Sequence, residues 1–142
     1  MARSDDALFA KGLRIRKAVL GAEAIERRLG TANRYTRGFE ELSTKAAWGL
    51  IWSRPGLSRR IRSFINLGVL TAMRQPEELR LHIRAALRNG LTRSEIAEAI
   101  LHCAVYCGIP RAADGRRAML EVFGELDAGK VRARTRRGAR RG

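Results

Sequence analysis

Apolar side chains recur every three or four residues along nearly the whole chain. This is the spacing of amphipathic helices, whereas strands require an alternation of apolar and polar residues that is almost absent here. Most helical stretches end in a short loop that contains Gly or Pro, and short loops favour antiparallel neighbours. The pattern therefore predicts an all-α fold, a compact bundle of about six or seven helices.

Breaks in the pattern predict the first three helices. We expect them over residues 5–19, 22–29 and 33–52, the last with a break near Ser43–Thr44. Pro55–Gly56 marks a sharp turn, because Pro and Gly are the residues that most often interrupt regular structure. Up to this turn the sequence predicts helices and no strand.

The next helix is the most apolar. Ser58 can cap its first turn, since a serine oxygen accepts a hydrogen bond from a free backbone N–H there. Its apolar positions are too numerous for a surface helix, so we expect it to be the central buried element. They are Ile61, Phe64, Ile65, Leu67, Val69 and Leu70.

Three further helices follow. Pro76 suits a first helical position, and Gly90 suits the left-handed residue that ends that helix. Thr92 and Glu95 have the spacing of a capping box, which opens the next helix. Pro110 can begin the last helix, which we expect to end at about Leu126.

The charge is strongly basic. The 142 residues carry 29 Lys and Arg against 14 Asp and Glu, a net charge of +15, and a chain of this length suits one domain. We assign residues 1–129 to that domain and 130–142 to a basic, disordered tail. Without the seven bases of the tail the net charge is still +8. Such a surface suits a small anionic substrate or, alternatively, nucleic acid.

No targeting or membrane segment is visible. The chain has no run of 18 apolar residues and no apolar stretch of signal-peptide length near its start. We therefore expect a cytoplasmic protein without a membrane partner. Cys103 and Cys107 lie four residues apart, which favours two small residues on a buried helix face and leaves a redox pair as the alternative. The sequence shows no set of metal ligands, so we expect no metal site.

Both histidines follow a glutamate by four residues. Glu78 precedes His82 and Glu98 precedes His102 within predicted helices, so each pair shares a helix face. A carboxylate at this distance can orient the imidazole and raise its pKa, giving a proton donor or base near neutrality. A surface ion pair is the alternative, and the spacing does not choose between the two histidines.

Both tryptophans fall in one short segment. Trp48 and Trp52 are followed by Arg54, and Arg62 and Ser63 begin the apolar helix. Indole rings beside a guanidinium could form a pocket that holds a carboxylate through two hydrogen bonds. The alternative is core packing followed by a turn.

Five stretches together resemble the 4-carboxymuconolactone decarboxylase family. They are residues 16–21, residues 47–57 (AWGLIWSRPGL), Arg62–Ser63, residues 82–90 (HIRAALRNG) and residues 104–110 (AVYCGIP). The resemblance covers roughly residues 12–126. It implies an AhpD-like all-helical fold that assembles as a homotrimer or homohexamer. Peroxidase members of the wider superfamily carry two cysteines before their histidine, and Gln75 and Glu78 stand at those positions here. The position of an upstream glutamate is Ser63. The thiol-dependent peroxidase is therefore kept only as an alternative.

The resemblance implies decarboxylation of 4-carboxymuconolactone to 3-oxoadipate enol-lactone in protocatechuate (β-ketoadipate) catabolism. The substrate is a small dianionic lactone whose unsaturated carbonyl takes up the electron pair, so no cofactor is implied. On this reading His82, oriented by Glu78, delivers a proton. Arg54 and Arg62 bind carboxylates, and the remaining substrate contacts come from Trp48, Trp52, Ser63 and Tyr106.

Overall fold

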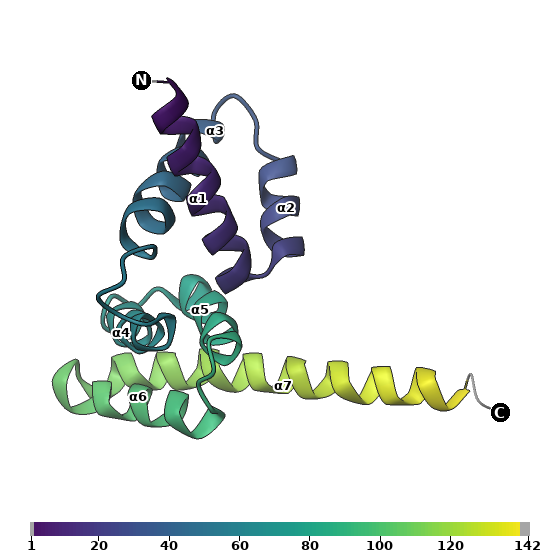
Figure 1. The fold of residues 1–142 in the computed structure, drawn as a ribbon. Helices are drawn as coiled ribbons and strands as arrows, with labels where there is room; N and C mark the ends of the chain where they lie inside the picture. Colours follow the sequence, from purple (N-terminus) through teal and green to yellow (C-terminus); the bar gives the residue numbers. More distant parts are fainter. Residues whose placement is uncertain (1, 140–142) are drawn as a thin grey trace. The chain divides into compact units, whose positions relative to one another are not determined.

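The computed structural model describes residues 2–139, and every regular element in that range is a helix (Figure 1). The predicted all-α class is confirmed. In chain order the elements are α1 (Ala2–Leu20), α2 (Ala22–Gly30), α3 (Arg37–Ser43), the π-helix η1 (Thr44–Ile51), α4 (Arg59–Ala72), α5 (Pro76–Arg88), α6 (Arg93–Tyr106) and α7 (Ile109–Ala139).

The residues group into two compact units. Unit 1 holds the chain up to Ile65 together with Ala85–Leu91, and unit 2 holds Asn66–Arg84 together with the chain from Thr92 on. Helices α4 and α5 therefore contribute residues to both units. The predicted division of the sequence at residues 129 and 130 stays a prediction.

In unit 1, helix α1 packs against α2 and η1 (Figure 1). The contact with η1 brings two backbones together at Gly12, where a Cβ atom would collide with the carbonyl oxygen of Thr44 and lie 2.9 Å from the nitrogen of Gly49. Glycine is therefore required for this crossing. The core of unit 1 is built from Ile15, Val19, Leu20, Ile25, Trp48, Trp52, Ala85, Ala86 and Leu91.

The predicted break near Ser43–Thr44 is the point where α3 gives way to η1. The Thr44 hydroxyl donates to the carbonyl of Glu40 at 2.7 Å, a contact that bends helices. A π-helical turn is wider than an α-helical one, because its hydrogen bonds span five residues and not four. One such bond closes the end of η1, where the N–H of Trp52 donates to the carbonyl of Ala47 at 2.9 Å. The helix expected from residue 33 begins instead at Arg37.

In unit 2, helices α6 and α7 lie side by side and run antiparallel, joined by a turn at Gly108 (Figure 1). Both carry buried apolar residues at helical spacing, as do the parts of α4 and α5 that belong to the same unit. The core of unit 2 contains Leu67, Leu79, Ile83, Ile96, Ile100, Cys103, Ala112, Ala118, Met119 and Val122.

The local helix signals are confirmed. The Ser58 hydroxyl accepts the N–H of Ile61 at 3.2 Å, and Pro76 is the first residue of α5. Gly90 adopts a left-handed φ of 90° just after α5. Thr92 and Glu95 form both hydrogen bonds of the capping box. These features need only neighbouring residues, which is why the sequence reveals them.

Two predictions about whole helices are wrong. Helix α4 is not a central buried element, because Ile61, Ile65 and Val69 are each close to half exposed and only Leu67 of the expected set is fully buried. The last helix does not end near Leu126. Helix α7 continues to Ala139, through most of the segment expected to be a disordered tail, and residues 140–142 lie outside the described residues.

Within the described range, no helix is both long enough and apolar enough to cross a lipid bilayer.

Candidate active site

His82 lies on the inner face of α5, between the buried residues Leu79 and Ile83, and only 9% of its surface is exposed. Its Nδ1 atom is 3.3 Å from the side-chain amide Nδ2 of Asn66, on α4. An amide NH₂ group can only donate, so in this arrangement Nδ1 accepts and a neutral ring carries its proton on Nε2. Both residues belong to unit 2.

The net pKa shift of His82 is opposite to the one predicted. Burial lowers the pKa of the imidazole, because it penalises the charged form, and the carboxylate of Glu78 raises it by a smaller amount. The glutamate acts in the expected direction, but the prediction of a net raised pKa is wrong. In the absence of a ligand, His82 is therefore a neutral imidazole near pH 7.

The structure separates the two histidines, which the sequence could not. His102 is exposed and its ring lies 4.6 Å from that of Tyr106, itself 77% exposed. Unlike His82, His102 lies in solvent. The predicted substrate contact of Tyr106 stays a prediction.

Trp48 and Trp52 form a buried ring pair in unit 1. Their ring centroids are 4.9 Å apart and the planes are tilted by 33°. Each side chain is less than one-tenth exposed, so both contribute to core packing, as the simpler alternative proposes. A contact between either indole and a substrate stays a prediction.

Arg54 and Arg62 are brought together by the Pro55–Gly56 turn. Nη2 of Arg62 donates to the backbone carbonyl of Arg54 at 3.2 Å, and the Arg54 side chain is exposed. Nε of Arg62 is buried and makes no hydrogen bond to the rest of the described chain. A buried donor without an acceptor is costly, and the predicted binding of a carboxylate by Arg62 stays a prediction.

Ser63 is fully buried and accepts a hydrogen bond from the Asn89 side chain at 2.9 Å. The predicted substrate contact of Ser63 stays a prediction. The predicted site residues thus fall in two groups: Glu78, His82 and Tyr106 in unit 2, and Trp48, Trp52, Arg54, Arg62 and Ser63 in unit 1. Each contact described above joins two residues of the same unit.

A buried ion pair in unit 1 was not predicted. Arg16, 2% exposed, contacts the Glu40 carboxylate at 2.7 Å and donates to the Thr44 hydroxyl at 2.9 Å. Arg28 donates to the other Glu40 oxygen at 2.7 Å. Burial acts to raise the pKa of Glu40, but the hydrogen bonds from the two arginines outweigh it and the pKa is lowered. The one sequence signal was an arginine placed among the apolar residues of α1.

Ion pairs with α7 neutralise part of the basic surface of unit 2. Arg80 contacts Glu121 at 2.6 Å, Arg93 contacts both oxygens of Asp127 at 2.7 and 2.9 Å, and Arg84 contacts Glu125. A nucleic-acid surface would need these cations to face phosphate. Their pairing with carboxylates does not favour that alternative.

Cys103 does not have the environment of a reactive thiol. It is buried, its Sγ lies 3.3 Å from the carbonyl oxygen of Ala99, and both cysteines are free. Burial, together with a smaller contribution from Cys107, raises the pKa of the Cys103 thiol. Because the thiolate is the reactive form, this setting disfavours the thiol-dependent alternative.

Comparison with known proteins gives three findings. Residues 37–121 match the model of the carboxymuconolactone decarboxylase family, a range that contains every predicted site residue. A 4-carboxymuconolactone decarboxylase of Acinetobacter baylyi is 39% identical over 123 residues, which cover 87% of this chain and 92% of the relative. A nitrosuccinic acid decarboxylase of Metarhizium robertsii is 50% identical over 103 residues, which cover 72% of each chain.

Proposed function

We propose that this chain, a carboxy-lyase that belongs to the carboxymuconolactone decarboxylase family, removes carbon dioxide from a small dianion that carries its own electron sink. The substrate we propose first is 4-carboxymuconolactone, and the product is 3-oxoadipate enol-lactone, in protocatechuate catabolism. The relative from Acinetobacter baylyi, which matches over 87% of this chain, is named 4-carboxymuconolactone decarboxylase.

The proposed reaction needs one proton. The bond between the ring carbon and the departing carboxylate breaks, and its electron pair moves through the ring double bond to the lactone carbonyl, giving a dienolate. That dienolate then takes a proton on the carbon next to the carbonyl. The protein must bind the anions, stabilise the dienolate oxygen and supply the proton.

The observation that carries the proposal is His82, a buried imidazole in a pair with Asn66 on the neighbouring helix. We assign the proton transfer to it. Its pKa is lowered in the free protein, and the carboxylates of a bound dianion would raise that pKa, because an opposite charge favours the imidazolium. The ring would thus take up a proton as substrate binds and release it to carbon in the reaction.

Arg62 and Arg54 are proposed as the anion ligands. The buried, unbonded Nε of Arg62 is the feature that supports this role, because a carboxylate would satisfy it through a charge-assisted hydrogen bond. Trp48 and Trp52 are proposed to shield the reacting carboxylate from water, which weakens its solvation and favours loss of carbon dioxide.

Nitrosuccinate is a second candidate substrate, favoured by the higher identity to the relative of that name. Here the carboxylate departs from the carbon that bears the nitro group, the electron pair moves onto the nitro oxygens, and the resulting nitronate takes a proton on carbon. Both substrates are small dianions with a built-in electron sink. The same cation and proton donor would therefore serve either reaction.

Turnover of the two candidates in D₂O tests the proposal. We expect release of carbon dioxide from at least one of them, with one deuterium in the product at the carbon that takes up the proton. NMR of the product identifies the decarboxylated compound and locates the deuterium in it. The faster substrate identifies the reaction, and failure to turn over either one would refute the proposed substrate class.

Asn66 is proposed as the residue that positions the His82 ring. We expect Asn66→Asp to raise the pKa of His82, since a carboxylate favours the imidazolium, and to move the proton of the neutral ring from Nε2 to Nδ1. Nitrogen-15 NMR resolves both effects, and the exposed His102 serves as an internal control because the chain has two histidines. An unchanged tautomer in this variant would remove Asn66 from the site.

We also propose that the chain assembles as a homotrimer or homohexamer. The exposed stripe of Ile61, Ile65 and Val69 on α4 is the supporting observation, because the described residues leave each of these apolar side chains close to half exposed. Light scattering should return a multiple of the 15.9 kDa chain mass. A monomeric mass would contradict this part of the proposal.

A further inference from the structure

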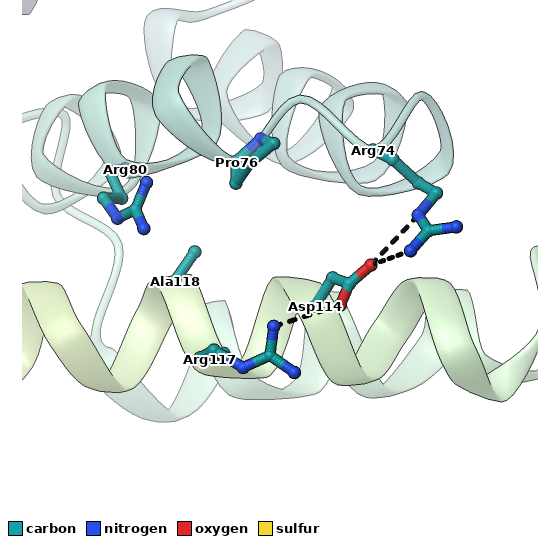
Figure 2. A pocket seen from close by; sticks show the side chains of 6 residues that line it. All are labelled: Arg74, Pro76, Arg80, Asp114, Arg117 and Ala118. Carbon is teal, nitrogen blue, oxygen red and sulfur yellow. Dashed lines mark hydrogen bonds and ion pairs between the residues drawn. The ribbon is translucent and has the colours of Figure 1, made fainter.

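A cavity with a strongly charged lining lies in unit 2, between α7 on one side and, on the other, the start of α5 with the segment that precedes it (Figure 2). Its volume is about 320 Å³, within the range typical of small-molecule pockets. Three arginines and one aspartate line it together with the small side chains of Pro76 and Ala118. The charged residues are Arg74, Arg80, Arg117 and Asp114. His82 is not among its lining residues.

The lining is rich in hydrogen-bond donors. Arg74 donates through Nε at 3.0 Å and Nη2 at 2.7 Å to one oxygen of Asp114, and Arg117 contacts the other oxygen at 3.3 Å (Figure 2). Each guanidinium has five N–H donors, so one carboxylate satisfies only part of their capacity. Arg80 is held in place from outside the lining by Glu77 and Glu121, each at 2.6 Å.

Arg74 has an unusual backbone. Its φ is +54°, and it is the one residue other than glycine with a positive φ in the described chain. A left-handed residue after a helix is usually Gly or Asn, because other side chains are strained there. A glycine would satisfy the backbone better. What the arginine supplies in its place is a side chain that reaches the cavity.

We propose that this cavity binds a small polyanion whose oxyanion groups reach separate guanidiniums. Such a ligand would add acceptors for the N–H groups that Asp114 leaves unused. The chemistry is shared by di- and tricarboxylates and by phosphate compounds. The site is distinct from the proposed reaction at His82, so it does not depend on the proposed function.

Citrate and inorganic phosphate are the two probes, titrated into the full-length protein at constant ionic strength. We expect at least one of them to shift the Nε–Hε NMR signals of Arg74 and Arg80, and the stronger ligand tells a polycarboxylate site from a phosphate site. Absence of a saturable shift with both probes would refute the proposal.

Two variants test the site with matched controls. Arg74→Gly removes a donor and the ion pair with Asp114 while relieving the backbone, so the protein should still fold. The Kd should nevertheless rise about tenfold or more, as expected for lost hydrogen bonds to a charged group. Arg59→Ala removes the same charge from an exposed position on α4 and should have little effect. If both variants raised the Kd equally, general charge attraction would explain the binding and the proposed site would be wrong.

Asp114→Asn gives the opposite expectation. Asp114 competes with the ligand for Arg74 and Arg117, so its neutralisation should lower the Kd of the bound probe. Glu98→Gln changes the net charge equally at an exposed position on α6 and is the control. Tighter binding in Asp114→Asn alone supports the cavity as the site, and an equal gain in both variants contradicts it.

Discussion

Substitution of His82 by alanine should lower kcat by about 10²-fold or more, which is the usual contribution of a positioned acid or base. The physical reason is that the dienolate or nitronate would have to take its proton from water. Steady-state turnover of the accepted substrate measures the loss, and a thermal unfolding curve shows whether the variant remains folded. His102→Ala is the matched control, because that ring is exposed and is not among the proposed site residues. An unaltered kcat in folded His82→Ala would exclude this residue from the chemistry.

The pH dependence gives a second test of the same residue. If His82 must be charged in the complex, kcat should fall as the pH rises through its pKa with substrate bound. The pKa that governs kcat/KM belongs to the free enzyme, where burial holds it below the ordinary value of 6.5. The limb in kcat should therefore lie at higher pH than the limb in kcat/KM. Coincident limbs would argue against a proton taken up on binding.

Substitution of Arg16 by alanine should be the most damaging change to stability. It removes one of the two arginine partners of a buried carboxylate, the one that is itself buried, and breaking a buried ion pair typically costs about 3–5 kcal/mol of unfolding free energy. The neighbouring Lys17 forms an exposed pair with Glu26 at the same distance of 2.7 Å. Lys17→Ala should cost at most about 1 kcal/mol. Urea unfolding compares the two, and equal losses would contradict a special role for burial.

Glu40 gives this pair a pH signature. Its pKa in the folded chain is lowered below 4.5, so the folded state binds its proton less readily than the unfolded state does. The stabilisation from this group is therefore complete above about pH 4.5 and is lost as the pH falls through the folded pKa. In Glu40→Gln, that part of the acid dependence should disappear.

Local signals in the sequence predicted local structure well. Ser58, Pro76, Gly90 and the Thr92–Glu95 box act through contacts within a few residues, and the structure contains all of them. The exposure of the apolar face of α4 could not be predicted from such local signals. Periodicity shows that a helix has an apolar face, but it does not show whether the surface that covers that face belongs to the same chain.

The candidate site was predicted in part for the same reason. Spacing to a glutamate did not distinguish His82 from His102, and His82 was chosen on the family resemblance. The direction of its pKa shift depends on burial, which neither of these reveals. Asn66 lies 16 residues from His82 along the chain, and Asp114 lies 40 residues from Arg74. Partners so distant in sequence become visible only when the helices are placed in space.

The π-helical form of the eight-residue η1 determines how this segment would respond to a change in its length. Each residue turns an α-helix by about 100°, and the wider π turns accommodate a residue that an ordinary helix would not. We expect deletion of one residue between Thr44 and Ile51 to replace the wider turns by α-helical ones, because the π turns take up that residue. The length of η1, as well as its residue types, therefore matters for how the chain enters the loop that carries Arg54.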